Sequence, residues 1–194
     1  MDFEGLKKIR YERARDTVGE MELEAEATAL LADDPSTVAF LRRCVADDLW
    51  IDAVRVMAQA LPRREAAWWA CLNARASLDD DAPEQSTRIL EAAEAWVFKP
   101  SDELGRKAFD LAEAAGFDTA ESYAALAVFW ACDNMAPPET EAVIEPDETL
   151  SGVAAAAAII LAVSKLKSPQ EATAWYERAM MQALDIARGG SGRL

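Results

Sequence analysis

The 194-residue chain contains no histidine. This absence excludes Ser–His and Cys–His nucleophile pairs, the usual general base near neutral pH and carboxylate–histidine metal sites. The cysteines, Cys44, Cys71 and Cys132, form no Cys-x-x-Cys pair, which argues against a structural zinc site. The phosphate-binding patterns G-x-x-x-x-G-K-[ST] and G-x-G-x-x-G are also missing. The sequence therefore predicts a protein that is not an enzyme and that holds no cofactor or metal.

Basic residues are scarce, with 20 Lys and Arg against 35 Asp and Glu and a formal net charge of −15. Nucleic acids and anionic membranes attract basic surfaces, so neither is an expected partner. The acidic charge suits either plain solubility or a partner protein with a basic surface.

Secretion signals and membrane spans are missing as well. An odd number of cysteines without close pairs suits a reducing compartment. The N-terminal stretch has no apolar core of a secretory signal. The longest apolar run, residues 152–163, is too short to cross a bilayer. We therefore expect a cytoplasmic protein without membrane insertion, and its oligomeric state stays open.

Glycine and proline number eight each, and runs of alternating β-branched residues are almost absent. Alanine dominates the apolar residues and favours helix. The predicted fold class is all-α, with about eight or nine helices in a compact bundle or a short solenoid-like stack of helical hairpins. We predict one domain over residues 1–188, with an N-terminal arm at 1–17, an acidic proline-rich loop at 133–148 and a flexible tail at 189–194.

Capping signals place several helix boundaries. Ser101 is predicted to cap a helix over 102–115, and Ser168-Pro169-Gln170-Glu171 has the pattern of a capping box. Asp34 and Asp147 are predicted as further N-caps. Residues 2–15 and 20–32 are predicted as helices from the spacing of their apolar residues.

An aromatic–Trp–Ala–Cys–x–Asn pattern occurs twice, beginning at Trp68 and at Phe129. In stretches 66–72, 124–132 and 153–163 the apolar residues are consecutive, so a helix there is apolar on every side and must be surrounded by other helices. The repeat reflects either a weak duplication or a shared packing solution. Cys71 and Cys132 are predicted to be inert packing thiols, and Cys44, after two arginines, lies in a more electropositive setting.

Two features are candidate recognition sites. Loop 133–148 holds three prolines and, from Glu139 onward, five carboxylates. Loops this long in compact domains are often functional, a plain linker being the alternative. The other is the pair Arg63-Arg64, where Arg64 is placed to stack on Trp68 or simply to pack locally. The predicted partner-binding residues are Arg63, Arg64, Glu139, Glu141, Glu145, Asp147 and Glu148.

The leading hypothesis for function is a protein-interaction module, adaptor or chaperone-like, in a bacterial secretion or signalling assembly. One alternative is an immunity or antitoxin-like protein whose acidic surface neutralises a basic toxin. The other is an enzyme that uses carboxylates or Cys44, which requires a concave pocket with convergent polar groups.

The stretch DAVRVMAQALPRREAAWWACLNA carries a resemblance. Its segments are Asp52-Ala53-Val54-Arg55, Ala60-Leu61-Pro62, and Arg64-Glu65-Ala66 followed by Trp68-Trp69-Ala70-Cys71. This stretch resembles a bacterial family of small, acidic, helix-rich proteins of unknown function, over about 20 residues closely and elsewhere in length and helical character. The resemblance implies a bacterial source and no established activity, and so transfers no catalytic residues.

Overall fold

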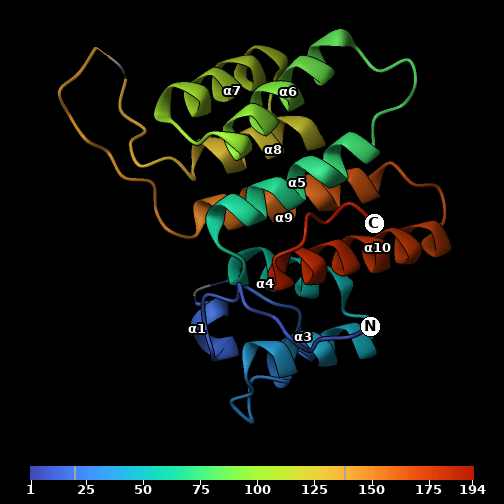
Figure 1. Cartoon of the computed structure of the whole chain (residues 1–194). Helices are drawn as coiled ribbons and strands as arrows, with labels where there is room; N and C mark the ends of the chain where they lie inside the picture. The colour runs from blue at the N-terminus through green and yellow to red at the C-terminus, as the bar shows by residue number, and fades with distance from the viewer. Residues whose placement is uncertain (20, 138) are drawn as a thin grey trace. The chain divides into compact units, whose positions relative to one another are not determined.

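A computed structural model describes residues 1–19, 21–137 and 139–194, so Glu20 and Pro138 lie outside the described residues. Within these ranges the regular structure is helical, and the one β-bridge, between Arg13 and Ser36, stands alone. The predicted all-α class is confirmed (Figure 1). Ten helices are present in the described ranges, against the eight or nine predicted, and two of them are only five residues long.

The chain forms two compact units, the first built from residues 1–62 and 167–194 and the second from residues 63–166. The second unit is thus inserted in sequence between two segments of the first. The single domain predicted over 1–188 stays a prediction.

Unit 1 is a small helical cluster in which α4 contacts α1, α3 and α10. Its core includes Phe40, Leu41, Val54, Met57 and Met180, all almost fully buried. The helices are α1 (Ala14–Val18), α2 (Ala25–Ala29), α3 (Thr37–Ala46), α4 (Trp50–Ala60) and α10 (Pro169–Arg188).

The helix predicted over residues 2–15 is wrong. Backbone N–H groups of Lys7 and Lys8 donate to the Ala187 carbonyl at 2.8 and 2.9 Å, and that of Arg10 donates to the Ala60 carbonyl at 2.8 Å. Both carbonyls lie in the last turn of a helix, where they lack an intrahelical partner. The N-terminal arm is therefore not helical, because its N–H groups bind the free carbonyls at the ends of α4 and α10. Its few apolar residues at helical spacing do not outweigh these bonds.

Two other N-terminal predictions also need correction. The helix predicted over 20–32 is reduced among the described residues to α2, which starts after Glu24. Asp34 does not cap α3: its backbone is left-handed, with φ of 49°, and the hydroxyl of Ser36 accepts the Ala39 N–H at 3.2 Å instead. Ser36 is the N-cap of α3 because it directly precedes the first helical residue and has an extended backbone.

Unit 2 is built around α8 (Ala120–Phe129), which contacts α5, α6, α7 and α9 (Figure 1). All residues of α8 except Tyr123 are buried, so the prediction of a central helix is confirmed there. The surrounding helices are α5 (Arg63–Ala76), α6 (Glu84–Phe98), α7 (Asp102–Ala115) and α9 (Leu150–Ser164).

The other two apolar stretches are less completely surrounded. Trp69 of α5 is fully buried, but its neighbour Trp68 is half-buried, as is Trp130 after α8. In α9 the side chain of Val153 is 50% exposed. The helices α5 and α9, whose sequences are apolar on all sides, therefore each keep one side partly exposed to water.

The predicted caps around unit 2 have mixed outcomes. Ser101 accepts the Leu104 N–H at 3.2 Å, and Ser168 with Glu171 forms the predicted capping box of α10. Asp147 does not cap α9, because the N-cap position is Thr149 and the helix starts at Leu150. The Asp147 Oδ1 instead accepts the Thr149 N–H and hydroxyl at 2.9 and 2.6 Å in the turn before the helix. In the tail, whose flexibility stays a prediction, Gly192 N–H donates to Asp185 at 2.8 Å.

Among the described residues, every helix is too short or too polar to pass through a bilayer.

Candidate functional site at the acidic loop

Loop 133–148, between α8 and α9, has an ordered base. The Asn134 Oδ1 accepts the N–H groups of Ala136 and Ile144, both at 2.9 Å, and the Met135 N–H donates to the Ile144 carbonyl at 2.8 Å. Asparagine suits this role because one side-chain oxygen accepts two hydrogen bonds. These bonds close the base of the loop between residues 134–136 and 144. The described residues 139–143 extend away from the helices of unit 2 (Figure 1).

Two side chains of α7 hold this base in place. The Arg106 Nη2 donates to the carbonyls of Met135 and Ala136, and its guanidinium lies 5.1 Å from the ring centre of Phe129. The Asp102 Oδ1 accepts the N–H of Asp133 at 3.1 Å. A planar, multi-donor guanidinium is well suited to hold two carbonyls at once. The loop is therefore attached to a helix about 30 residues earlier in the chain.

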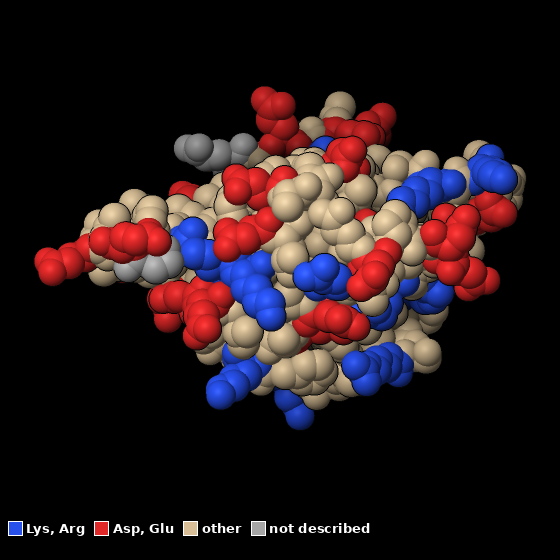
Figure 2. All heavy atoms as spheres, turned by 90° about the horizontal axis from the view of Figure 1, so that it is seen from above, with Lys and Arg blue, Asp and Glu red and all other residues tan. Residues whose placement is uncertain are grey.

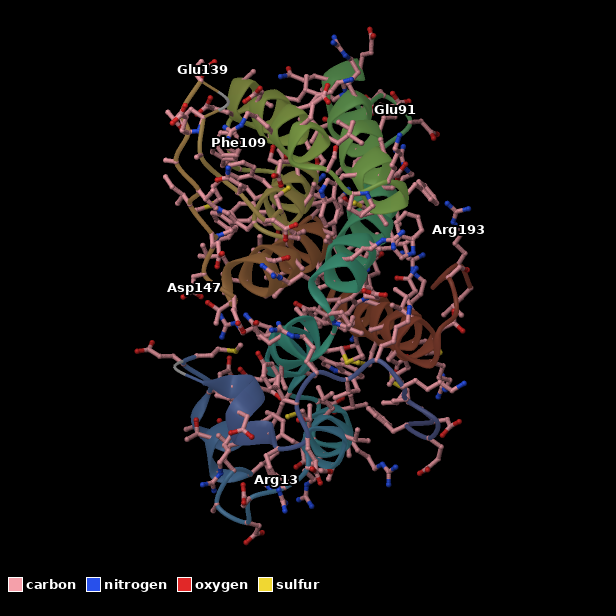
Figure 3. All side chains as sticks on the ribbon, turned by 60° about the vertical axis from the view of Figure 1, so that its left-hand side comes forward. Arg13, Glu91, Phe109, Glu139, Asp147 and Arg193 are labelled. Atoms are coloured by element: carbon pink, nitrogen blue, oxygen red, sulfur yellow. The ribbon has the colours of Figure 1, made fainter. Side chains whose placement is uncertain are left out.

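The predicted carboxylates lie on the outside of this loop. Glu139, Glu141, Glu145, Asp147 and Glu148 are all exposed. Figure 3 shows Glu139 and Asp147 pointing outwards from different parts of the loop, and Figure 2 shows acidic side chains at its projecting end.

Two apolar side chains lie among these carboxylates. Val143 is 71% exposed and Ile144 is 48% exposed. Water-exposed valine and isoleucine on an ordered loop are available for contact with another surface. The loop thus presents negative charge and apolar area together.

The structure places the two predicted arginines at two different pockets, both of which Asp133 of the loop also lines. Arg63, at the start of α5, borders a pocket of about 280 Å³ together with Asp133, Glu145 and Glu148. The Arg64 Nε donates to the Val97 carbonyl at 2.7 Å, and this residue borders a second pocket of about 350 Å³ that Asp102 and Asp133 also line. The sequence-distant residues Arg63, Glu145 and Glu148 therefore line one pocket, and Arg64 lines another.

Trp68 does have an aromatic partner. Its ring centre lies 5.8 Å from that of Phe98, at an interplanar angle of 58°. This contact with Phe98 is local packing. The sequence alone leaves two interpretations, stacking of Arg64 on Trp68 and local packing.

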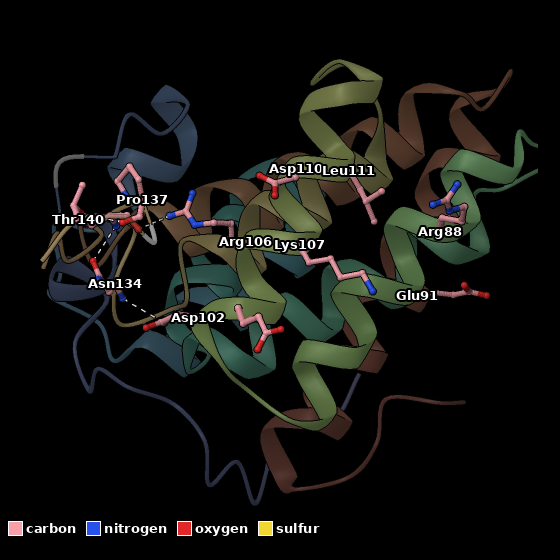
Figure 4. A pocket seen from close by; sticks show the side chains of 12 residues that line it. Arg88, Glu91, Asp102, Arg106, Lys107, Asp110, Leu111, Asn134, Pro137 and Thr140 are labelled. Atoms are coloured by element: carbon pink, nitrogen blue, oxygen red, sulfur yellow. Dashed lines mark hydrogen bonds between the residues drawn. The ribbon is translucent and has the colours of Figure 1, made fainter. Parts of the chain in front are cut away.

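A larger pocket, of about 740 Å³, lies between the loop and helices α6 and α7 (Figure 4). Arg106 and Lys107 line it, next to acidic Asp102 and Asp110. The sequence analysis did not identify this pocket. Its α7 residues recur with helical spacing, but a polar stripe on a helix is also what an ordinary solvated face looks like. The remaining lining residues are Arg88, Glu91, Glu103, Leu111, Asn134, Ala136, Pro137 and Thr140.

A protein-family model matches residues 40–187, more than half of the chain. Its description is a family of unknown function, DUF6931. The chain belongs to this family. The match includes the resembling stretch of residues 52–74. No curated protein and no solved structure matches the chain.

The three thiols of this DUF6931 member are buried. Burial raises the pKa of Cys44 and of Cys132 to about 12, and it also raises the pKa of Cys71. The electropositive setting expected for Cys44 is wrong: after burial, the strongest influences on its pKa are the carboxylates of Asp52 and Asp47, which raise it further. A nucleophilic role for Cys44 therefore has no structural support.

These raised pKa values predict a loss of stability in alkali. A thiol that keeps its proton in the folded state stabilises that state fully below the unfolded pKa near 9, and this contribution disappears as the pH rises through the folded pKa near 12. We expect the free energy of unfolding to fall above pH 9. The Cys44→Ala/Cys132→Ala variant should lose less over pH 9–11, as measured by urea denaturation. Equal slopes for the two proteins would contradict the assignment.

Proposed function

We propose that this protein is a non-catalytic protein-interaction module, adaptor or chaperone-like, that binds a partner with a basic surface through loop 133–148. The observation that carries the proposal is the contrast within the loop. Its base is fixed by Asn134, Arg106 and Asp102, while its carboxylates and Val143 remain exposed.

This arrangement has two physical advantages for binding. A loop whose base is already fixed loses less conformational entropy when a partner binds. Five exposed carboxylates within ten residues attract a basic surface and speed encounter, whereas the apolar side chains add contact area after docking. Arg63, which lines the same pocket as Glu145, adds a guanidinium group that can donate hydrogen bonds to carbonyls or carboxylates of the partner.

The cellular setting is part of the proposal. Three free thiols suit the cytoplasm, and an adaptor of a secretion or signalling assembly is the setting we favour. An immunity or antitoxin-like protein would use the same loop. It would differ in binding a single basic enzyme tightly and with strong salt dependence.

The proposal predicts that neutralising the loop removes the partner. We expect the variant Glu139→Gln/Glu141→Gln/Glu145→Gln to recover the partner at least about tenfold less well than the native chain at low salt, because three charge contacts are lost. The measurement is site-specific photo-crosslinking from position 143 in the source cell, followed by identification of the attached protein and binding assays with that protein after purification.

A matched control separates loop contact from general charge. The variant Asp79→Asn/Asp80→Asn/Asp81→Asn also removes three negative charges, but from the turn between α5 and α6, and it should bind normally. If both variants lose the partner equally, or if the loop variant keeps it, the loop is not the contact surface.

A further inference from the structure

Unit 1 contains a pocket of its own, of about 210 Å³, beside the start of α4. Its walls combine two kinds of side chain. Trp50 and Tyr176 supply aromatic rings, and Glu24, Asp48 and Asp52 supply three carboxylates. The aliphatic side chains of Leu49 and Ile51 complete the lining.

The aromatic part is held in a defined orientation. The rings of Trp50 and Tyr176 are parallel within 2°, with centres 6.3 Å apart. The Trp50 Nε1 donates to the Asp48 Oδ1 at 3.2 Å. Asp48 has a left-handed backbone, with φ of 58°, because it follows the C-cap of α3, where the Leu49 N–H donates to the Cys44 carbonyl at 2.8 Å. The indole is therefore oriented by the residue that follows the C-cap of α3.

Asp52 is a buried carboxylate that is incompletely satisfied. It is 1% exposed, and its Oδ2 accepts only a long hydrogen bond, 3.4 Å, from the Glu24 N–H. Its Oδ1 accepts no hydrogen bond from the described residues. The Arg55 Nη1 lies 3.8 Å from this oxygen and donates instead to the Glu22 carbonyl at 3.4 Å. Burial raises the pKa of Asp52, as expected for a carboxylate without strong donors.

We propose that this pocket binds the ammonium or guanidinium group of an organic cation. Ring faces carry negative electrostatic potential and attract such groups, and the carboxylates of Glu24, Asp48 and Asp52 add negative charge, of which that of Asp52 is the least satisfied by hydrogen bonds. Three carboxylates in the lining disfavour an anion. A metal ion fits poorly, because among the described residues no group of three acidic or cysteine side chains is arranged to hold one.

The cation has two sources with the same chemistry. It is either a free small amine or guanidine, or a lysine or arginine side chain of a protein. The pocket volume suits one such head group rather than a larger ligand. All lining residues belong to unit 1, so this site does not depend on the function proposed for loop 133–148.

The test is a titration of the full chain with defined probes. N-acetyl-arginine amide and n-butylammonium are the cations, and N-acetyl-citrulline amide and 1-butanol are their neutral counterparts. The readout is the indole ¹H–¹⁵N resonance of Trp50, assigned with Trp50→Phe. We expect the cations to shift it saturably and the neutral compounds to leave it unchanged.

Variants test the named groups. Asp52→Asn preserves shape and should weaken cation binding at least about tenfold, whereas Asp79→Asn, which removes one charge from unit 2, should not. Because Asp52 is buried, folding of the variant is checked by circular dichroism. A second pair gives independent evidence: Tyr176→Phe keeps the ring face and should bind, and Tyr176→Leu should not.

The source is distinguished by affinity. Tight binding of a free probe indicates a small-molecule ligand, and much tighter binding of an arginine within a peptide such as acetyl-Gly-Arg-Gly-amide indicates a protein side chain. The proposal is overturned if no cation shifts Trp50, if the citrulline compound binds as well as the arginine compound, or if a folded Asp52→Asn variant binds like the native chain.

Discussion

Replacing Trp69 by alanine is expected to lower the free energy of unfolding by about 3–5 kcal/mol, the range for a fully buried large aromatic residue. Trp69 has no exposed surface, and its helix α5 contacts α6, α8 and α9. Neighbouring structure relaxes only partly into the space that a deleted side chain leaves. The same replacement at Trp68 should cost clearly less. This side chain is half-buried and rests against the exposed ring of Phe98, so water already reaches part of it.

The pair is a matched experiment, because both residues lie in α5 and both changes remove an indole. Urea denaturation followed by circular dichroism measures the two losses without relying on tryptophan emission. Many domains have stabilities of only about 5–15 kcal/mol, so Trp69→Phe provides a milder variant if Trp69→Ala does not fold. Equal losses at the two positions would show that the burial of α5 is described incorrectly.

The helix class and several helix ends could be predicted because they depend on local chemistry. Ser101 and Ser168 bind backbone groups three residues away, and such signals are visible in a short window of sequence. The consecutive apolar residues of α8 similarly predict its central position. These predictions are confirmed because the local preference and the tertiary packing agree.

The N-terminal arm could not be predicted for the opposite reason. Its hydrogen bonds go from Lys7 to Ala187 and from Arg10 to Ala60, across 180 and 50 residues of sequence. Three apolar residues at helical spacing give no information about carbonyl groups so far along the chain. Loop 133–148 gives a similar case. Its charges can be read from the sequence, but its attachment by Arg106 depends on hydrogen bonds to carbonyls 29 and 30 residues further along the chain.

The pocket in unit 1 is a further case. Asp48 and Trp50 are close in sequence, but Tyr176 comes from α10 and completes the aromatic pair only after folding. A sequence search for histidine, cysteine pairs or phosphate loops cannot find a site that uses ring faces and carboxylates, because these residue types are common on any acidic helical protein.

Gly105 gives a second large effect, through its contact with Cys132. A Cβ atom added at Gly105 would lie 2.1 Å from the Cys132 Sγ, far inside contact distance. Alanine is otherwise favoured over glycine within a helix by about 1 kcal/mol. We expect Gly105→Ala nevertheless to destabilise the protein, by about 1–3 kcal/mol, because overpacking forces α7 or the thiol to shift.

The cause is isolated by removing the sulfur. In Gly105→Ala/Cys132→Ala the new methyl group occupies space that the Sγ atom has vacated, so the double variant should be more stable than Gly105→Ala alone. Urea denaturation of the native chain, both single variants and the double variant gives a coupling free energy, expected at about 1–2 kcal/mol for groups in direct contact. Additive losses would mean that α7 meets a different neighbour. Positive coupling would show that the second Trp–Ala–Cys segment places its cysteine where α7 approaches most closely, as a packing role for this thiol requires.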